Sequence, residues 1–356
     1  MGKHTELIDG GLRSLVGTRK FYKKVLLVAV PIMIQNGITN FVSLLDNIMV
    51  GQVGTEQMSG VAIANQLVFI FNLCIFGAVA GAGILSAQFY GSGNAEGVRD
   101  TFRFKLLFGV ILSVIFAVIF LTVGEPLIQQ FIHQGEGIGD LEATRSYGKA
   151  YLEVIVIGIL PFALTQCYSG TLRETGETVI PMIAGIIAVC VNLVFNYILI
   201  FGKLGAPELG CVGAAIATVL SRFVELAIVA GWTHKHVARN PFIRGALRSF
   251  KILGSLLKQI IAIGLPLFIN ELMWSFGITF MTQCYSVRGL EVVAAFNIAN
   301  TISNVFNVIF LSLGNAVGII IGQMLGAGRL EEAKREDKQL IAFSVFCCFL
   351  TGAMLI

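Results

Sequence analysis

The sequence predicts an all-α polytopic membrane protein of two parallel six-helix bundles, a twelve-helix architecture of which about nine transmembrane helices are present. Apolar residues make up 56% of the chain and charged residues only 13%, whereas soluble proteins carry about 25% charge. Apolar runs of about 20 residues recur along the chain, and its second part repeats the first. With 40 Gly and 27 Phe but only 7 Pro, the composition favours packed helices over a transmembrane β-barrel.

Apolar runs separated by charged or turn residues give the individual helices in order. The first run follows a basic, polar stretch and is too long for the apolar region of a cleaved signal peptide. The last run ends the chain in apolar sequence with no polar flank. The predicted helices lie near residues 25–50, 59–86, 104–124, 147–169, 178–201, 211–233, 255–285, 292–324 and 339–356.

Lys and Arg are distributed unevenly over the connections, which predicts the orientation of the chain. The N-terminus and every second connection hold 20 of the 25 basic residues. Because basic loops stay in the cytoplasm, we expect a multi-pass protein of the plasma (inner) membrane with a cytoplasmic N-terminus. The few bases elsewhere are Arg145, Lys149, Lys203 and Arg288 in the opposite connections and Arg222 within a span.

The chain aligns with itself at an offset of 235 residues without a gap. Chance is a poor explanation, because the matches include Pro, Asn, Gln and Glu as well as Gly and aliphatic residues. Each unit begins after an even number of spans, so the two bundles run parallel. Matching pairs include Pro31 with Pro266, Asn65 with Asn300, Gln88 with Gln323, Gly91 with Gly326, and Glu96 with Glu331.

This repeat predicts the domain organisation. We expect an N-terminal cytoplasmic tail over 1–24, a six-helix lobe over 25–234, a basic cytoplasmic linker over 235–254, and the first three helices of a second lobe over 255–356. A complete second copy would reach roughly residue 470, so three helices are expected to be missing. The chain by itself is therefore not expected to transport.

Polar residues within the predicted spans are the candidates for function, because a carboxylate at membrane depth is costly unless it is protonated, paired or bound to a cation. Counting from the helix ends places Asp46, Asn196 and Thr218 at one level, with Asn192 one turn deeper than Asn196 on the same face. Their oxygens suit a proton on Asp46 or a possible Na+ ion held by all four residues. Alternatively, the amides and the hydroxyl only bond between helices.

Other residues in the spans have weaker assignments. Pro31 removes a backbone hydrogen bond and predicts a hinge in the first helix, unless it only shapes the bundle. Glu271 is a second-lobe acid that either couples to a cation, contacts a cationic substrate, or bonds to a neighbouring helix. Arg222 and Glu225 are three residues apart on a helix and are expected to pair. Glu153 lies near the outer end of its span, 147–169, and is expected to be solvated.

The remaining chemistry is sparse. The seven cysteines lie in or beside apolar stretches without a C-x-x-C pair, so they are expected to be free core residues. We expect no enzyme activity, no catalytic residue and no cofactor beyond H+ or Na+ as a coupling ion.

Several segments in their order along the chain resemble the multidrug and toxic compound extrusion (MATE) family of cation-coupled exporters. The similarity covers essentially everything after Lys20. The motifs that carry it are LDNIMVG over 45–51, ANQ over 64–66, QFYGSGN over 88–94, SGTLRETGET over 169–178 with Pro181, NLVFNYILIFG over 192–202 and GAAIATVLSR over 213–222.

The resemblance implies two six-helix lobes around a central cavity, with Asp46 as the coupling acid and Asn192 and Thr218 lining its pocket. Many members carry Asp where this chain has Asn196, which leaves this site one acid fewer. The implied function is an antiporter that exports amphipathic organic cations in exchange for H+ or Na+ by alternating access of the lobes. Expected partners are small organic cations, the coupling ion and the lipid bilayer, with no nucleic acid and a monomeric protein. A flippase for lipid-linked oligosaccharides and a non-transporting receptor or scaffold are the alternatives.

Overall fold

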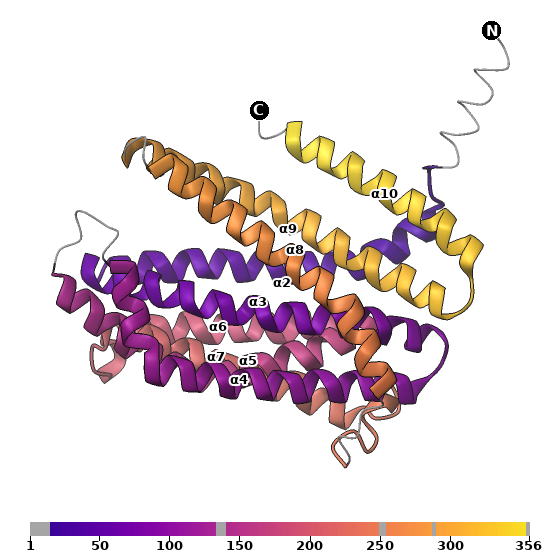
Figure 1. Ribbon diagram of the computed structural model, residues 1–356, viewed down its shortest axis with the longest axis horizontal. Coiled ribbons are helices and arrows are strands. Elements are labelled where there is room, and N and C mark those ends of the chain that lie inside the picture. Colours follow the sequence, from indigo (N-terminus) through magenta and orange to yellow (C-terminus); the bar gives the residue numbers. More distant parts are fainter. Residues whose placement is uncertain (1–14, 133–139, 249–253, 287–289, 354–356) are drawn as a thin grey trace, which may run out of the picture.

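The computed structural model describes residues 15–132, 140–248, 254–286 and 290–353, which are almost entirely α-helical (Figure 1). The segment predicted as the first lobe, which keeps that name here, contains α2 (Arg19–Gly51), α3 (Thr55–Gly91), α4 (Ala95–Ile132), α5 (Leu141–Glu174), α6 (Val179–Ile200) and α7 (Gly210–Lys235), with a short 3-10 turn η1 (Lys203–Gly205) before α7 and another, η2 (Pro241–Ile243), after it. After these come α8 (Gly254–Ser286), α9 (Leu290–Gly326) and α10 (Leu330–Ala353). The prediction of an all-α polytopic fold is thus confirmed.

Eight of the described helices, α2 to α9, are long and apolar enough to cross a membrane. The ninth predicted span, in α10, does not reach that criterion within the described residues, because seven charged residues stand between Leu330 and Gln339. Each even-numbered helix begins at the end of the molecule that carries the basic connections, and each odd-numbered helix ends there. These two ends are called here the basic end and the opposite end.

Several helices extend beyond the predicted spans, because their outer turns are polar and were not part of an apolar run. Helix α2 begins at Arg19, within the segment predicted as a tail, and the Thr18 side chain caps it by accepting from the Phe21 N–H at 3.3 Å. Helix α5 begins at Leu141, where Asp140 accepts from two backbone N–H groups, and it continues to Glu174.

The first lobe packs around α3 and α5, which lie side by side and contact α4 and α7 as well. Their crossing depends on small residues, since a Cβ on Gly60 would stand 2.7 Å from the Gly148 nitrogen. Helix α2 lies outside this centre against α6. Buried aliphatic and aromatic residues of α3, α4, α5 and α7 form the main apolar cluster of the lobe.

The segment after α7 is held against α4 at the basic end. Arg103 donates to the carbonyls of Gly245 and Ala246 at 2.7 and 2.9 Å, and Phe242 and Ala246 are buried. The predicted linker is therefore a packed connection over its described part, up to residue 248.

Helices α8 and α9 lie against α3 and α2, and these contacts repeat with the offset of the sequence. Where α2 meets α9, Ala29 packs with Ala316; where α8 meets α3, Gly264 packs with Gly81. Each of these residues is 235 positions from its counterpart. The same correspondence relates the cluster of Phe21, Val25, Ile320 and Met324 to the cluster of Leu256, Ile260, Leu85 and Phe89.

The two copies of this arrangement meet where α3 crosses α9 near the basic end. A Cβ on Gly91 would collide with the backbone carbonyl of Gln323, and a Cβ on Gly326 would collide with the carbonyl of Gln88. Between them, a Cβ on Gly322 would stand 3.1 Å from the Cβ of Ala87. Because these contacts map onto each other by the 235-residue offset, a pseudo-two-fold axis passes through this crossing.

Candidate cation site between helices α2, α6 and α7

The four predicted residues of the cation site come from three helices of the first lobe. Asp46 lies five residues before the end of α2, and Asn196 lies four residues before the end of α6. Thr218 lies eight residues after the start of α7, which returns from the opposite end. At about 1.5 Å per residue, these positions are about 6–12 Å from the helix ends, so the side chains share one level of the bundle.

The structure brings all four side chains into one chain of hydrogen bonds. The Asn196 Nδ2 donates to the Asp46 Oδ1 at 2.5 Å and to the Asn192 Oδ1 at 3.1 Å. The Asn192 Nδ2 in turn donates to the Thr218 Oγ1 at 3.3 Å. Asn192 and Asn196 are buried, whereas Asp46 is half-buried. The carboxylate therefore stands at the accessible end of a polar chain that leads into the lobe.

One acceptor of this chain is unused, because the Asn196 Oδ1 is buried and has no hydrogen-bond partner in the described part of the molecule. A buried amide oxygen without a donor is costly. Turning the Asn196 amide by a half-turn would direct this oxygen at Asp46, which a bound cation or a protonated Asp46 would favour. In the arrangement seen here, the amide N–H instead solvates a carboxylate. At the Asp46 carboxylate, a cation or a proton can thus take the place of the Asn196 N–H donor.

Arg222 and Glu225 interact electrostatically, but they do not form the direct ion pair that was expected. The Arg222 guanidinium lies 4.9 Å from the centre of the Phe162 ring and donates to the Gly158 carbonyl at 3.4 Å. Both partners are on α5, so the base ties α7 to α5. A cation–π contact with a neighbouring helix replaces the pair predicted from spacing along one helix.

The predicted second-lobe acid lies apart from these four residues. Glu271 is half-buried in α8 and makes no hydrogen bond or ion pair with the described residues. Its repeat counterpart, Asn36, donates to Ser312 of α9 at 3.2 Å. The position of α3 that corresponds to Ser312 is Gly77, which has no side chain that could bond to Glu271. The predicted hinge, Pro31, lies inside a continuous α2. The N-terminal part of this helix is tilted relative to the rest (Figure 1).

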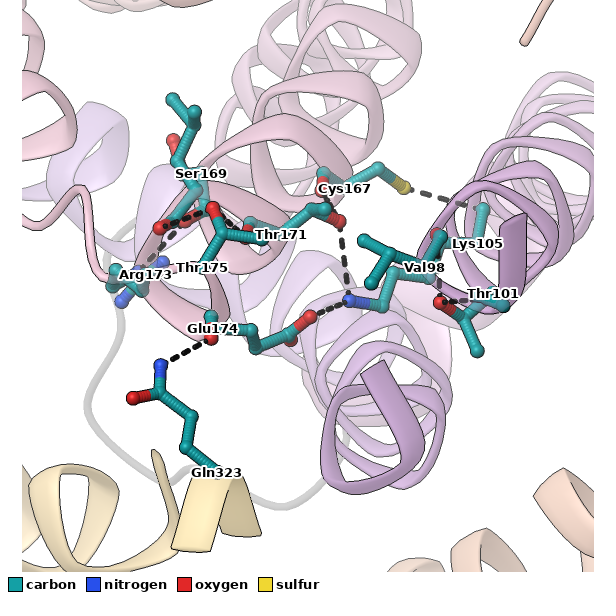
Figure 2. A network of polar contacts seen from close by, with 12 residues as sticks. Val98, Thr101, Lys105, Cys167, Ser169, Thr171, Arg173, Glu174, Thr175 and Gln323 are labelled. Atoms are coloured by element: carbon teal, nitrogen blue, oxygen red, sulfur yellow. Dashed lines mark hydrogen bonds and ion pairs between the residues drawn. The ribbon is translucent and has the colours of Figure 1, made fainter. Parts of the chain in front are cut away.

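Sequence reasoning missed a buried ion pair at the basic end (Figure 2). The Lys105 ammonium of α4 is fully buried and lies 2.5 Å from a carboxylate oxygen of Glu174, at the end of α5. It also donates to the Thr171 hydroxyl at 3.2 Å. Lys105 falls inside the predicted span 104–124, which indicated a buried charge. Its partner could not be identified, because Glu174 lies beyond the predicted span 147–169.

This ion pair is connected to the second lobe. The Gln323 Nε2 of α9 donates to the Glu174 backbone carbonyl at 2.7 Å, next to the crossing of α3 and α9 (Figure 2). The Glu174 carboxylate also fits against Gly83 of α3, where a Cβ would collide with it. Side chains of α4, α5 and α9 therefore meet at one buried polar group, which packs against the backbone of α3 at Gly83. This network joins α9 to the first lobe at the basic end.

No group of three or more His, Cys, Asp and Glu side chains able to hold a metal occurs in the described ranges. The seven cysteines are free thiols, although Cys190, Cys284 and Cys348 are exposed and not core residues as expected. A possible Na+ site at Asp46 therefore has one carboxylate, and its other ligands are amide and hydroxyl oxygens, which hard cations accept.

Comparisons with known proteins place the chain among relatives of similar architecture. It is 29% identical over 311 residues to the probable multidrug resistance protein NorM of Thermotoga maritima, covering 87% of this chain and 64% of the relative. It is 26% identical over 344 residues to the probable multidrug resistance protein YoeA of Bacillus subtilis, covering 94% of this chain and 70% of that protein. The chain thus spans about two thirds of the length of these relatives.

A solved structure shows the same fold. The outward-facing conformation of a multidrug resistance MATE family transporter of the MOP superfamily has a TM-score of 0.83 at 23% identity, over 97% of this chain and 73% of that chain. The model of the MatE family matches residues 31–198 and 266–356, which include Asp46, Asn192 and Glu271. With this match over more than half of its residues, the chain belongs to the MatE family.

Proposed function

We propose that the chain carries the cation-coupling lobe of a secondary antiporter that exports amphipathic organic cations in exchange for H+ or Na+. The observation that carries this proposal is the hydrogen-bonded chain from Asp46 through Asn196 and Asn192 to Thr218. A carboxylate, two amides and a hydroxyl at one level of an apolar bundle form a set that a proton or a small cation can enter. The names of the relatives support efflux of drugs as the activity.

The geometry suggests how binding is coupled to movement. A proton or Na+ on Asp46 removes its attraction for the Asn196 N–H, and the amide turns to present its oxygen. Asp46 is on α2 and its partner is on α6, so this exchange weakens the bond that holds the two helices at this level. Pro31 lies 15 residues before Asp46 and gives α2 a place to bend. A repacked α2 then changes the space beside it.

The position of the lobe contacts supports alternating access with the basic end closed. Contacts of α2 and α3 with α8 and α9 occur along the basic half, at Ala29, Asn36 and Gly81 and at the α3–α9 crossing. Asp46 lies ten residues beyond Asn36 towards the opposite end, about 15 Å further along α2. We infer that the basic end is cytoplasmic and that Asp46 receives its ion from the opposite side.

The exposed side chains of α8 support an organic cation as the cargo. Met273, Trp274 and Phe276 are exposed along this helix, and polarisable or aromatic faces suit amphipathic cations. A lipid-linked saccharide with its phosphates would need free bases instead. Arg222 and Lys105, two buried bases within the helices of the first lobe, are bound to Phe162 and Glu174. The organic cation is therefore the better-supported cargo.

The test is efflux of a fluorescent organic cation from cells that express the full open reading frame, under an imposed gradient of H+ or of Na+. We expect efflux to follow one gradient and to be lost in Asp46→Asn, because the amide cannot take up a proton or neutralise a cation. Glu142→Gln, an exposed residue in the first turn of α5, is the matched control and should keep full efflux. Unchanged efflux in Asp46→Asn would contradict the coupling role.

Ion binding is measured separately on the purified chain. If Na+ is the coupling ion, NaCl should raise the unfolding temperature of the native chain above that in choline chloride, since a ligand of the folded state stabilises it. Asp46→Asn should abolish this difference. If H+ is the coupling ion, neither protein should respond to Na+, and only the efflux experiment under a proton gradient should separate them.

A further inference from the structure

A cavity between α4 and α5 near the opposite end lies outside the cation site. Its volume is about 350 Å³, and its floor includes the buried side chains of Phe120 and Leu152. Leu121 forms part of its wall and is 62% exposed. This wall continues along exposed apolar residues of α4 such as Val118, which face lipid if the helix spans the membrane. The cavity therefore opens towards acyl chains.

Charged groups of both signs stand at the rim of this cavity. Glu125 of α4 binds two bases of α5, Lys149 at 2.8 Å and Arg145 at 3.6 Å, which leaves one positive charge in excess. Glu153, one turn along α5 from Lys149, also lines the cavity. It makes no hydrogen bond or ion pair with the described residues. The rim thus offers an excess positive charge at Lys149 and Arg145 and, one turn along α5, the Glu153 carboxylate, which interacts electrostatically with Lys149 but makes no direct ion pair with it.

One residue of the lining has a backbone carbonyl without its usual helical donor. Thr122 lines it, and the residue four positions later is Pro126. Proline has no N–H, so the Thr122 carbonyl lacks the hydrogen bond that a helix would otherwise give it. A group with several N–H donors can satisfy this carbonyl and the Glu153 carboxylate together. A primary ammonium is such a group.

We propose that this cavity binds an aminophospholipid of the phosphatidylethanolamine class from the leaflet at the opposite end. The ammonium of the headgroup binds Glu153 and the Thr122 carbonyl, and its phosphate binds Lys149 and Arg145. The acyl chains lie on Leu121 and the apolar wall below it. The net charge at the rim is zero, which fits a zwitterion better than an organic cation or an anionic lipid.

The experiment is native mass spectrometry of the purified chain with equal amounts of phosphatidylethanolamine, phosphatidylcholine and phosphatidylglycerol of the same acyl composition. We expect phosphatidylethanolamine to be retained about tenfold over phosphatidylcholine, because the choline nitrogen has no N–H for Glu153 and charge-assisted bonds are strong. Glu153→Gln should reduce the preference to within about twofold, and Glu153→Asp should retain it.

Glu142→Gln is the matched control, because it removes the same charge from an exposed position of α5 outside the cavity. It should keep the tenfold preference, and all variants should unfold at the native temperature. Equal retention of the three lipids, a preference for phosphatidylglycerol, or an equal loss in both Gln variants would overturn the proposal. Displacement of the lipid by equimolar soluble phosphoethanolamine or tetraphenylphosphonium would also overturn it, by assigning the cavity to a free headgroup or an organic cation.

Discussion

At the scale of single residues, the amide of Asn196 is the central member of the candidate cation site. Its N–H groups bind Asp46 and Asn192, while its buried oxygen has no partner in the described part of the chain. Spacing along the sequence was sufficient to predict that Asp46, Asn192, Asn196 and Thr218 meet, since positions counted from helix ends share a level. It was not sufficient to predict the direction of the hydrogen bonds, because an amide offers a donor and an acceptor at one position.

Asn196→Asp should make the site depend on a cation. Two carboxylates in place of the Asn196–Asp46 hydrogen bond repel each other, which should lower stability by about 1–3 kcal/mol without Na+. Na+ ligated by both acids should restore it. The measurement is the unfolding temperature of the purified chain in NaCl and in choline chloride. A variant whose unfolding temperature is the same in both salts would show that the second acid does not face Asp46.

Lys105→Met should be severely destabilising, by about 3–5 kcal/mol, because it leaves the Glu174 carboxylate buried without its cation. Lys105→Met combined with Glu174→Met removes both charges and should recover most of this loss. Thermal unfolding of Lys105→Met, of Glu174→Met and of the double variant gives the coupling energy. Additive losses in the double variant would mean that the two side chains act independently.

At the scale of helices, the ends of elements were the least predictable feature. Apolar runs located α2 to α9 but missed the polar turns of α4 and α5, including the end of α5 that carries Glu174. Pairing within one helix also misled, since Arg222 binds Phe162 of α5 rather than Glu225. Contacts between helices depend on which face each one buries, and the sequence of one helix does not contain the neighbour that covers it.

Gly91→Val and Gly326→Val should force α3 and α9 apart at the basic end, because each added side chain meets a backbone carbonyl that cannot yield. Lys24 of α2 and Glu336 of α10 are 3.4 Å apart across the lobes, so a carbodiimide should join them in the native chain. The yield of this cross-link, measured by peptide mass spectrometry, should fall several-fold in either variant.

Gly314→Val is the control for this experiment. A Cβ at Gly314 meets nothing within 4 Å, although the residue is on α9 as well, and the cross-link should form as in the native chain. An equal loss of the cross-link in all three variants would indicate general unfolding of α9 rather than separation of the lobes.

At the scale of the whole molecule, the repeat proved the most informative feature of the sequence. It predicted that two units start on the same side, and the structure adds that their contacts obey the same offset, with α2 on α9 matching α8 on α3. The distribution of Lys and Arg predicts which end of the molecule faces the cytoplasm, and the fold alone does not show this. The assignment of lobe boundaries stays a prediction.

Orientation can be measured in intact cells. Lys203 is exposed in the turn between α6 and α7 at the opposite end, and Arg244 is exposed after α7 at the basic end. We expect a membrane-impermeant maleimide to label a cysteine at position 203 in intact cells, and to label one at position 244 only after permeabilisation. The native cysteines are replaced by Ala and Ser beforehand, and the reverse labelling pattern would invert the proposed topology.

The crossing of α3 and α9 has a consequence for how substitutions act over evolution. In a homodimer of one such bundle, both glycine–carbonyl contacts at the two-fold axis would involve the same residue of each copy. A single substitution at the position of Gly91 would therefore alter both contacts at once. Gene duplication into one chain separates them, so each contact mutates alone. Asn36 with Ser312 and its image, Glu271 with Gly77, have already diverged in this way. The glycines at 91 and 326 have not, because each still faces a carbonyl with no room for a side chain.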